Sequence, residues 1–327
     1  MPVGGYDNLF VLGASMPRRS ICVRLGTFLT AALIIGGAGC MRRAAPAVTH
    51  QLMFVTLPES RAVAIFPANA SGDAQPLATI RESAPDLPVD ASIDLRNEVF
   101  IANANGNIKI YAGRNPNDYR QVRELGGPHT GMEHVTGMAV DLSGDIFIAD
   151  QGIKPGEAHI LWFAAALNGN ILPVREIIGP HTGLTSPEGI AIDSAGETFV
   201  VDRQTNRVLV FAADAEGDAA PVAILGGLNQ PRRVFVDGDL NVYVTNHGDD
   251  SLAIFVADGP QHWTRNASVT SPAMRNPDGV TADSAGRIAV AVPNAVLFFG
   301  ANASGSSTPK WSLQGPAAMN PATLLIR

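Results

Sequence analysis

The sequence predicts an all-β protein, a six-bladed β-propeller whose ring is closed by the last strand of the chain. Three observations predict this fold. The 327 residues include 33 glycines and 23 prolines, which favours many short strands joined by tight turns. A unit of about 45 residues recurs along the chain, and a repeat of that length holding four short strands is typical of a propeller blade. The last seven residues match the opening of this repeat.

An aspartate at the end of the first strand marks each unit. These aspartates are Asp94, Asp141, Asp193, Asp237 and Asp283, at spacings of 47, 52, 44 and 46 residues. The best-formed unit predicts strands at 189–192, 198–201, 207–211 and 221–225. Residues 193–196 predict a tight turn, because Asp bonds its own backbone and Gly accepts a positive φ. The apolar residues come in runs of four or five, as expected of strands covered on both faces.

A loop of small residues ending in Gly and a polar residue follows the third strand in four units. It reads FPANASGD at 66–73, FAAALNGN at 163–170, FAADAEGD at 211–218 and FGANASGS at 299–306. Four such copies support the repeat.

The units divide the chain into six blades, and the first is incomplete. The predicted blades are 51–86, 87–132, 133–184, 185–227, 228–270 and 271–319. The first has three strands, at 52–56, 62–66 and 77–80, and lacks an inner strand. Residues 321–327, PATLLIR, match 187–193, PEGIAID, in register. We therefore expect the last strand to complete the first blade, which removes exposed strand edges.

The first 39 residues predict a secretory signal peptide. Arg18, Arg19 and Arg24 precede an apolar stretch at 25–35 and small residues at 36–39. The apolar stretch is shorter than the roughly 20 residues that span a bilayer as a helix. The segment before Met16 fits this layout poorly, so Met16 is the expected start.

Cys40 directly follows the small residues and resembles the lipidated cysteine of bacterial lipoproteins. Gly37 departs from that pattern, because leucine is usual there. The resemblance implies a lipid on Cys40, a tether over 40–50 and an extracytoplasmic protein anchored to a membrane. A secreted or periplasmic protein without lipid is the alternative.

Residues 186–211, SPEGIAIDSAGETFVVDRQTNRVLVF, resemble the NHL-repeat family almost throughout. That family's blades open with Pro-x-Gly-apolar-Ala-apolar-Asp and carry an Asn-Arg strand ending in Phe. Residues 276–283 match the opening only, and the blade at 228–270 keeps Asp237, Asn246 and Phe255. The resemblance covers residues 51–327 unevenly. It implies a six-bladed propeller and little about activity, since propellers serve unrelated tasks.

Charge and cysteine content exclude several classes of function. The formal net charge is −7 and the body has no long basic run, so we expect no nucleic-acid partner. Cys22 and Cys40 both lie in the N-terminal segment, so the body has no disulfide and no thiolate metal site.

The default binding surface is the face that carries the loops before strand one and after strand two. The aligned residues where the inner strands start are Val89, Thr136, Glu188, Arg232, Asp278 and Ala322. A ring mixing Glu188, Arg232 and Asp278 could hold a cation or a polar ligand. An internally paired ion network is the interpretation we favour.

The second strands end in side chains that carry oxygen atoms. They are Asn103, Asp150, Asp202 and Asn246. Such oxygens are typical calcium ligands. Capping of the turn into strand three is favoured, because separate blades hold these residues apart.

Several histidines fall on loops of the same face. His129 and His181 lie in duplicated Gly-Pro-His-Thr-Gly loops, and His134, His159 and His247 lie nearby in the predicted fold. Three histidines can form a catalytic zinc site, and the amidating lyases use a related propeller with a histidine-bound metal. The duplication favours turn chemistry instead.

A loop at 150–159 is longer than its counterparts, which points to the binding side.

The sequence therefore predicts a noncatalytic binding or scaffold module with a protein or glycan partner, a membrane contact through Cys40 and no cofactor or metal. It contains no Gly-x-Ser-x-Gly elbow, phosphate-binding loop, dinucleotide fingerprint or His-Glu-x-x-His. A calcium- or zinc-dependent hydrolase or lyase of the lactonase or amidating-lyase type is the alternative. A structural protein of the cell envelope is a third.

Overall fold

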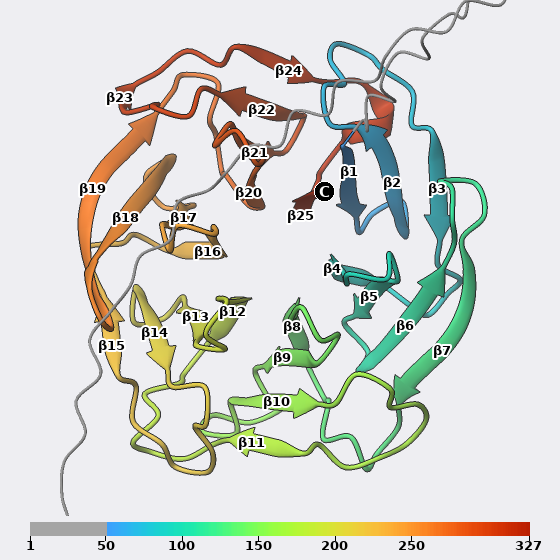
Figure 1. Ribbon diagram of the computed structural model, residues 1–327, viewed down its shortest axis with the longest axis vertical. Helices are drawn as coiled ribbons and strands as arrows, with labels where there is room; N and C mark the ends of the chain where they lie inside the picture. The colour runs from blue at the N-terminus through green and yellow to red at the C-terminus, as the bar shows by residue number, and fades with distance from the viewer. Residues whose placement is uncertain (1–50) are drawn as a thin grey trace, which may run out of the picture. The chain divides into compact units, whose positions relative to one another are not determined.

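The computed structural model describes residues 51–327, in which six β-sheets are arranged as blades around a central axis (Figure 1). The signal peptide, Cys40 and the tether predicted over residues 1–50 lie outside the described residues. Within 51–327 the only helix is the short 3-10 turn η1 (Pro316–Ala318). The predicted six-bladed propeller is confirmed. None of the described residues forms a helix with the length and apolar character needed to cross a bilayer.

Each blade has four antiparallel strands, with the first at the channel and the fourth at the outer edge. Blade 1 contains β25 (Thr323–Ile326), β1 (Leu52–Leu57), β2 (Ala62–Pro67) and β3 (Ala78–Arg81). Blade 2 contains β4 (Pro88–Ile93), β5 (Val99–Asn103), β6 (Asn107–Ala112) and β7 (Arg120–Gly126). Blade 3 contains β8 (Val135–Val140), β9 (Ile146–Asp150), β10 (His159–Phe163) and β11 (Arg175–Ile177).

The remaining three blades repeat this order. Blade 4 contains β12 (Pro187–Ile192), β13 (Thr198–Asp202), β14 (Arg207–Phe211) and β15 (Ala223–Leu225). Blade 5 contains β16 (Pro231–Val236), β17 (Val242–Asn246), β18 (Ser251–Gly259) and β19 (His262–Thr270). Blade 6 contains β20 (Val280–Ala282), β21 (Ile288–Val292), β22 (Ala295–Phe299) and β24 (Trp311–Leu313). The short β23 (Gly305–Ser306) pairs with β19.

Every seam between neighbouring blades has an apolar core of its own. Between blades 2 and 3, for example, Phe100 and Ile110 lie in one cluster with Met138 and Ile148. Because a blade is covered on both faces, its second strand is buried at every position in blades 2 to 6, as in β13 and β17, and at all but the first position in blade 1. This double coverage explains why the sequence shows apolar runs where a half-exposed strand would alternate.

The predicted aspartate turns form in all five units. In each, one carboxylate oxygen accepts the backbone N–H groups two and four residues ahead, at 2.8 to 2.9 Å. In the best-formed unit Asp193 accepts from Ala195 and Glu197, and Gly196 takes a φ of 84°. The turn is therefore fixed by local chemistry, which is why it was readable from the sequence.

The repeated small-residue loop links each of four blades to its neighbour. Its glycine, at φ between 57° and 84°, pairs in parallel with the outer strand of the preceding blade. The four pairs are Gly72 with Leu313, Gly169 with Leu125, Gly217 with Ile177, and Gly305 with Val269. At Gly217 the N–H donates to the Glu176 carbonyl at 2.7 Å, and the Gly217 carbonyl accepts from Ile178 at 2.9 Å. We call this contact the clasp.

Among the described residues 51–327, two seams on opposite sides of the ring have no clasp. At the seam between blades 1 and 2, Lys109 pairs with Glu82 at 2.8 Å and Asp86 at 2.5 Å. At the seam between blades 4 and 5, Trp263 packs edge-on against Phe199 with ring centroids 5.1 Å apart. Side-chain contacts thus join the neighbouring blades at the two seams that have no backbone clasp.

The predicted ring closure is confirmed. β25 pairs antiparallel with β1, and Phe54 lies opposite Leu325. The Leu52 and Arg327 backbones each donate to the other, and Thr323 Oγ1 donates to Thr56 Oγ1 at 2.8 Å. Small differences occur at the outer edges: the fourth strand of blade 4 begins at Ala223, where the sequence suggested 221, because the edge strands are short.

Candidate binding site at the channel mouth

The starts of the inner strands and the ends of the second strands surround the mouth of the central channel. A pocket of about 420 Å³ opens there over blades 5, 6 and 1. Its walls include Glu59, Arg232, His247, Asn276 and Asp278. This volume lies within the range of small-molecule sites.

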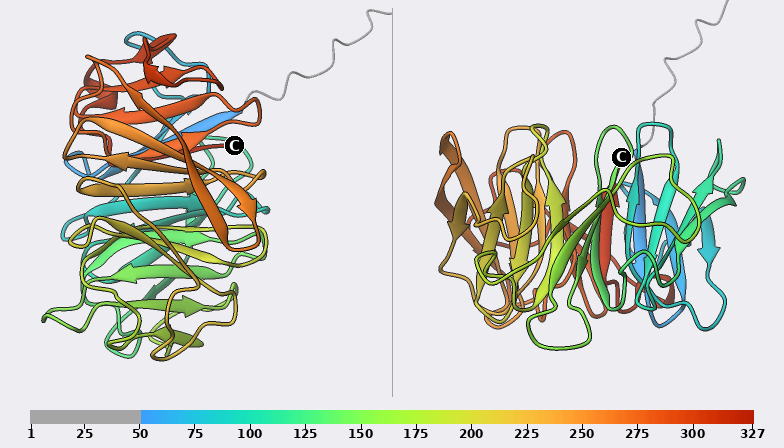
Figure 2. Two further views of the ribbon diagram at one scale, coloured as in Figure 1. Left: turned by 90° about the vertical axis from the view of Figure 1, so that its left-hand side faces the viewer. Right: turned by 90° about the horizontal axis from the view of Figure 1, so that it is seen from below.

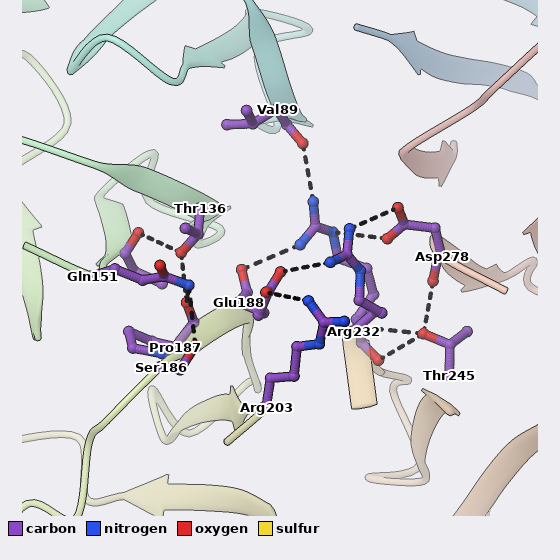
Figure 3. A network of polar contacts seen from close by, with 12 residues as sticks. Val89, Thr136, Gln151, Ser186, Pro187, Glu188, Arg203, Arg232, Thr245 and Asp278 are labelled. Atoms are coloured by element: carbon purple, nitrogen blue, oxygen red, sulfur yellow. Dashed lines mark hydrogen bonds and ion pairs between the residues drawn. The ribbon is translucent and has the colours of Figure 1, made fainter. Parts of the chain in front are cut away.

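The structure brings Glu188, Arg232 and Asp278 together at this mouth, as Figure 3 shows. The Arg232 guanidinium lies 3.4 Å from a carboxylate oxygen of Glu188 on one side and 3.4 Å from one of Asp278 on the other. Arg203 reaches the second Glu188 oxygen at 3.5 Å. Burial lowers the pKa of Arg232, but the two carboxylates outweigh it and the net pKa is raised. The favoured ion network is therefore present, and it lines an open pocket.

The other three aligned residues have smaller parts. Thr136 donates its hydroxyl toward the Pro187 carbonyl at 2.8 Å and the Ala149 carbonyl at 3.1 Å, which ties blade 3 to blade 4 (Figure 3). The Val89 carbonyl oxygen accepts a hydrogen bond from Arg233, and Ala322 lines the pocket.

Arg233 is the mouth residue that the sequence alignment missed. Its guanidinium donates to the Glu188 carbonyl and, across the channel, to the Val89 carbonyl, both at 3.2 Å. Its Nε lies 3.9 Å from Asp278, and only 8% of the residue is exposed. Arg233 thus spans blades 2, 4, 5 and 6 and narrows the channel beneath the pocket.

The sequence feature that marks Arg233 lies one position after the aligned residues Glu188, Arg232 and Asp278. Blades 3, 4 and 6 have glycine there, at Gly137, Gly189 and Gly279, because the inner strands approach closely. A Cβ on Gly189 would lie 2.8 Å from the Arg232 carbonyl oxygen and 2.9 Å from the Arg233 Cα. Blades 2 and 5 carry Asp90 and Arg233 at this position. Two charged residues in a register of glycines mark side chains that fill the channel.

Asp90 lies deeper in the channel, beside a cavity of about 160 Å³. Its two oxygens accept the Ala91 N–H at 2.8 Å and the Met138 N–H at 3.0 Å. Burial raises the pKa of Asp90, and the Arg233 charge and these N–H donors offset only part of that rise.

The oxygen-bearing residues at the strand-two ends are fully buried, and the oxygens of Asp150, Asp202 and Asn246 already accept hydrogen bonds. Asp150 accepts the N–H groups of Glu133, His134 and Gly152 at 2.7 to 3.0 Å. Asp202 accepts from Thr185, Ser186 and Thr205.

Of the two amides at these strand ends, Asn246 acts in the same way, whereas the side-chain oxygen of Asn103 has no hydrogen-bond partner among the described residues. Asn246 accepts the Asn229 N–H at 3.1 Å, and Asn103 donates to Asn107 at 2.9 Å. In Asp150, Asp202 and Asn246 the oxygens hold the loop that enters strand one of the same blade, so each supports a loop at the face and none lines the pocket.

The histidines do not converge. His129 and His181 are exposed, and their backbone N–H groups donate at 2.7 Å to Asn170 and Asp218, the residues that follow two clasp glycines. The backbone of the duplicated loop thus binds the side chain that follows the clasp glycine of the next blade. His159 lies between Glu176 and Asp150, and His247 lines the pocket. Among residues 51–327 no three His, Cys, Asp or Glu side chains are placed to share a metal ion.

The long loop at 150–159 lies on the same face as the pocket but away from its walls. Its tip turns at Lys154 and Glu157, whose side chains pair at 3.1 Å, and Ile153 is 74% exposed.

No protein-family model matches the chain, and no curated protein matches it. Solved structures match its fold. A protein of unknown function from Bacteroides caccae has a TM-score of 0.62 at 12% identity, covering 85% of this chain and 99% of that one. A chain of the nidogen/laminin complex has a TM-score of 0.62 at 13% identity, covering 84% and 97%. The periplasmic gluconolactonase of Pseudomonas aeruginosa has a TM-score of 0.59 at 13% identity, covering 85% and 98%. At these identities the likeness shows the fold alone.

Proposed function

We propose that this chain is an exported, lipid-anchored propeller of NHL type that acts as a noncatalytic binding module. The observation that carries the proposal is the pocket of about 420 Å³ at the channel mouth, with charged side chains around it. Arg232 pairs with Glu188 and Asp278, and none of these side chains is paired as a nucleophile with a base.

The positions of Gln51, the first described residue, and of Arg327 support an anchored binding module. Gln51 and Arg327 lie at the face that carries the turns between strands one and two, opposite the pocket; the label C in Figure 2 marks that edge of the ring. A lipid on Cys40 would be joined to the propeller through Gln51, which lies on the face opposite the pocket. Two or more acyl chains give stable attachment, at roughly 0.8 kcal/mol per buried CH₂.

Fractionation tests the anchor. We expect the chain to sediment with membranes in a bacterial host that processes lipoproteins, and Cys40→Ser to shift it to the soluble extracytoplasmic fraction. A wild-type chain that is already soluble and exported would contradict the lipid and leave the exported binding module in place.

Site-specific photocrosslinking tests the binding face. A photoreactive residue at the exposed Glu59 or Asn276 lies at the pocket, whereas Leu142, 68% exposed, lies on the opposite face as a matched control. We expect a crosslinked partner from the first two positions and none from Leu142. Crosslinks only from Leu142, or equal ones from all three, would contradict the channel mouth as the binding site.

A second candidate is a metal-dependent hydrolase or lyase. The likeness to the periplasmic gluconolactonase of Pseudomonas aeruginosa favours it at the level of fold.

A further inference from the structure

The guanidinium of Arg232 lies further from its carboxylate partners than the guanidinium groups of Arg96 and Arg287 do in the strand-one turns. In the strand-one turns, Arg96 lies 2.8 Å from Asp94 and Arg287 lies 2.5 Å from Asp283. Charge-assisted pairs of this kind usually measure about 2.7 to 2.9 Å. Arg232 instead lies 3.4 Å from each of two carboxylates, although it is more buried, with 25% of its side chain exposed against 56% for Arg96.

Most of the hydrogen-bonding capacity of Arg232 is therefore unused. A guanidinium has five N–H donors in a planar fork that matches a carboxylate. The described residues give Arg232 one side-chain hydrogen bond, from Nη2 to Asp278, and leave its buried Nε without a partner.

The network at the mouth carries more positive than negative charge. Arg203, Arg232 and Arg233 face the two carboxylates of Glu188 and Asp278. This excess of one guanidinium stands out in a chain with a net charge of −7.

The remaining titratable groups around the mouth do little to cancel this excess. Asp90 lies deeper in the channel, outside the walls of this pocket, and its two oxygens accept the backbone N–H groups of Ala91 and Met138. Glu59 is exposed at the rim, where water screens it, and His247 completes the wall.

Part of the pocket wall is apolar. Pro58, Pro293 and Pro321 line it together with Val89 and Ala322. A ligand that fits therefore combines one charged group with a compact body that contacts apolar surface.

We propose that the channel mouth binds a small organic carboxylate, with its negative group on the Arg232 guanidinium and its body against the three prolines. The inference rests on the proposed binding function and gives it a ligand class. A monoanion matches the excess of one positive charge. A phosphate monoester carries about −1.5 to −2 near pH 7, more than the network compensates.

Calorimetric titration of the full chain in detergent tests the ligand class. The probes are acetate, lactate and galacturonate, each against its neutral counterpart acetamide, lactamide or galactose, with inorganic phosphate as a further anion. We expect at least one carboxylate to bind, its neutral counterpart to bind about tenfold or more weakly, and added salt to weaken the binding.

Three variants separate a charge effect from a fold effect. Arg232→Gln is expected to weaken carboxylate binding about tenfold or more, and Asp278→Asn is expected to strengthen that binding because it removes a competing negative charge. Arg96→Gln, the same substitution on the opposite face, is expected to leave binding unchanged. Melting temperatures show whether each variant is folded. A merely structural role for the network would not produce tighter binding in Asp278→Asn.

The two experiments can contradict the carboxylate ligand and the binding function separately. If phosphate or the neutral probes bind as well as the carboxylates, or if Arg232→Gln binds normally, the carboxylate assignment is wrong. In that case, photocrosslinking at Glu59 and Asn276 still reports on the binding module. If no probe binds and no partner crosslinks at the mouth, both proposals are wrong.

Discussion

At the residue scale, Asp202 shows how one buried carboxylate fixes a loop beside the pocket. Its oxygens accept the N–H groups of Thr185, Ser186 and Thr205 at 2.6 to 3.0 Å. Burial alone would raise the pKa of Asp202, but these donors outweigh burial, and the pKa lies below its usual 3.8. The charged form therefore stabilises the fold above about pH 3.8, and this contribution is lost as the pH falls through the lower folded value.

Asp202→Ala is predicted to lower the free energy of unfolding by about 3 kcal/mol at pH 7, because buried N–H groups lose their acceptor. The difference from wild type should shrink as the pH falls below about 3.8, because wild-type Asp202 then becomes protonated whereas the variant has no carboxylate at this position. Urea unfolding at pH 7 and pH 3 measures both effects, with Asp214→Ala at an exposed position as the control. Equal stability of the two variants at pH 7 would contradict this role.

Which residues could be predicted depended on how local their chemistry is. Asp193 and Gly196 form a turn within a few residues of sequence, so the repeat predicted it. Arg233 acts across the ring on Val89, 144 positions away, and no periodicity within one blade reveals that contact. The ring of Glu188, Arg232 and Asp278 was found because each occupies the same place in its blade.

At the scale of elements, the clasp explains a loop that the sequence showed only as a repetition. Its glycine sits at a positive φ that a β-branched residue resists, at a cost of roughly 1 to 2 kcal/mol. Gly217→Val is predicted to destabilise the fold by about this amount. Gly226→Val is the matched control, because Gly226 has no positive φ and a Cβ there would meet open space. Chemical denaturation that shows equal losses for both would contradict the importance of the clasp.

Loss of ring closure by β25 is predicted to destabilise the propeller more than loss of one clasp does. Deleting 320–327 exposes the edge of β1 and uncovers the buried Val55 and Met53. We expect the melting temperature of the whole propeller to fall by well over ten degrees, because all six seams depend on closure. Met319→Ala, at a half-exposed position just before the strand, should melt as wild type does. A truncated chain with an unchanged melting temperature would overturn the closure.

At the scale of the whole molecule, the two faces of the propeller differ in structure. One face carries the tight aspartate turns and both ends of the described chain, and the other carries the pocket, the long 150–159 loop and the loosely paired charges. The sequence predicted the ring and the face, since both follow from the repeat. The pocket over blades 5, 6 and 1 was not predictable, because it arises where the unequal blades meet.

We propose that this propeller binds through its channel mouth without metal-dependent chemistry. The most direct measurement is the metal content of the purified chain, together with its melting temperature before and after treatment with a chelator. We predict no stoichiometric calcium or zinc and an unchanged melting temperature. Stoichiometric metal and a melting temperature lowered by the chelator would contradict the claim and support the metal-dependent hydrolase or lyase.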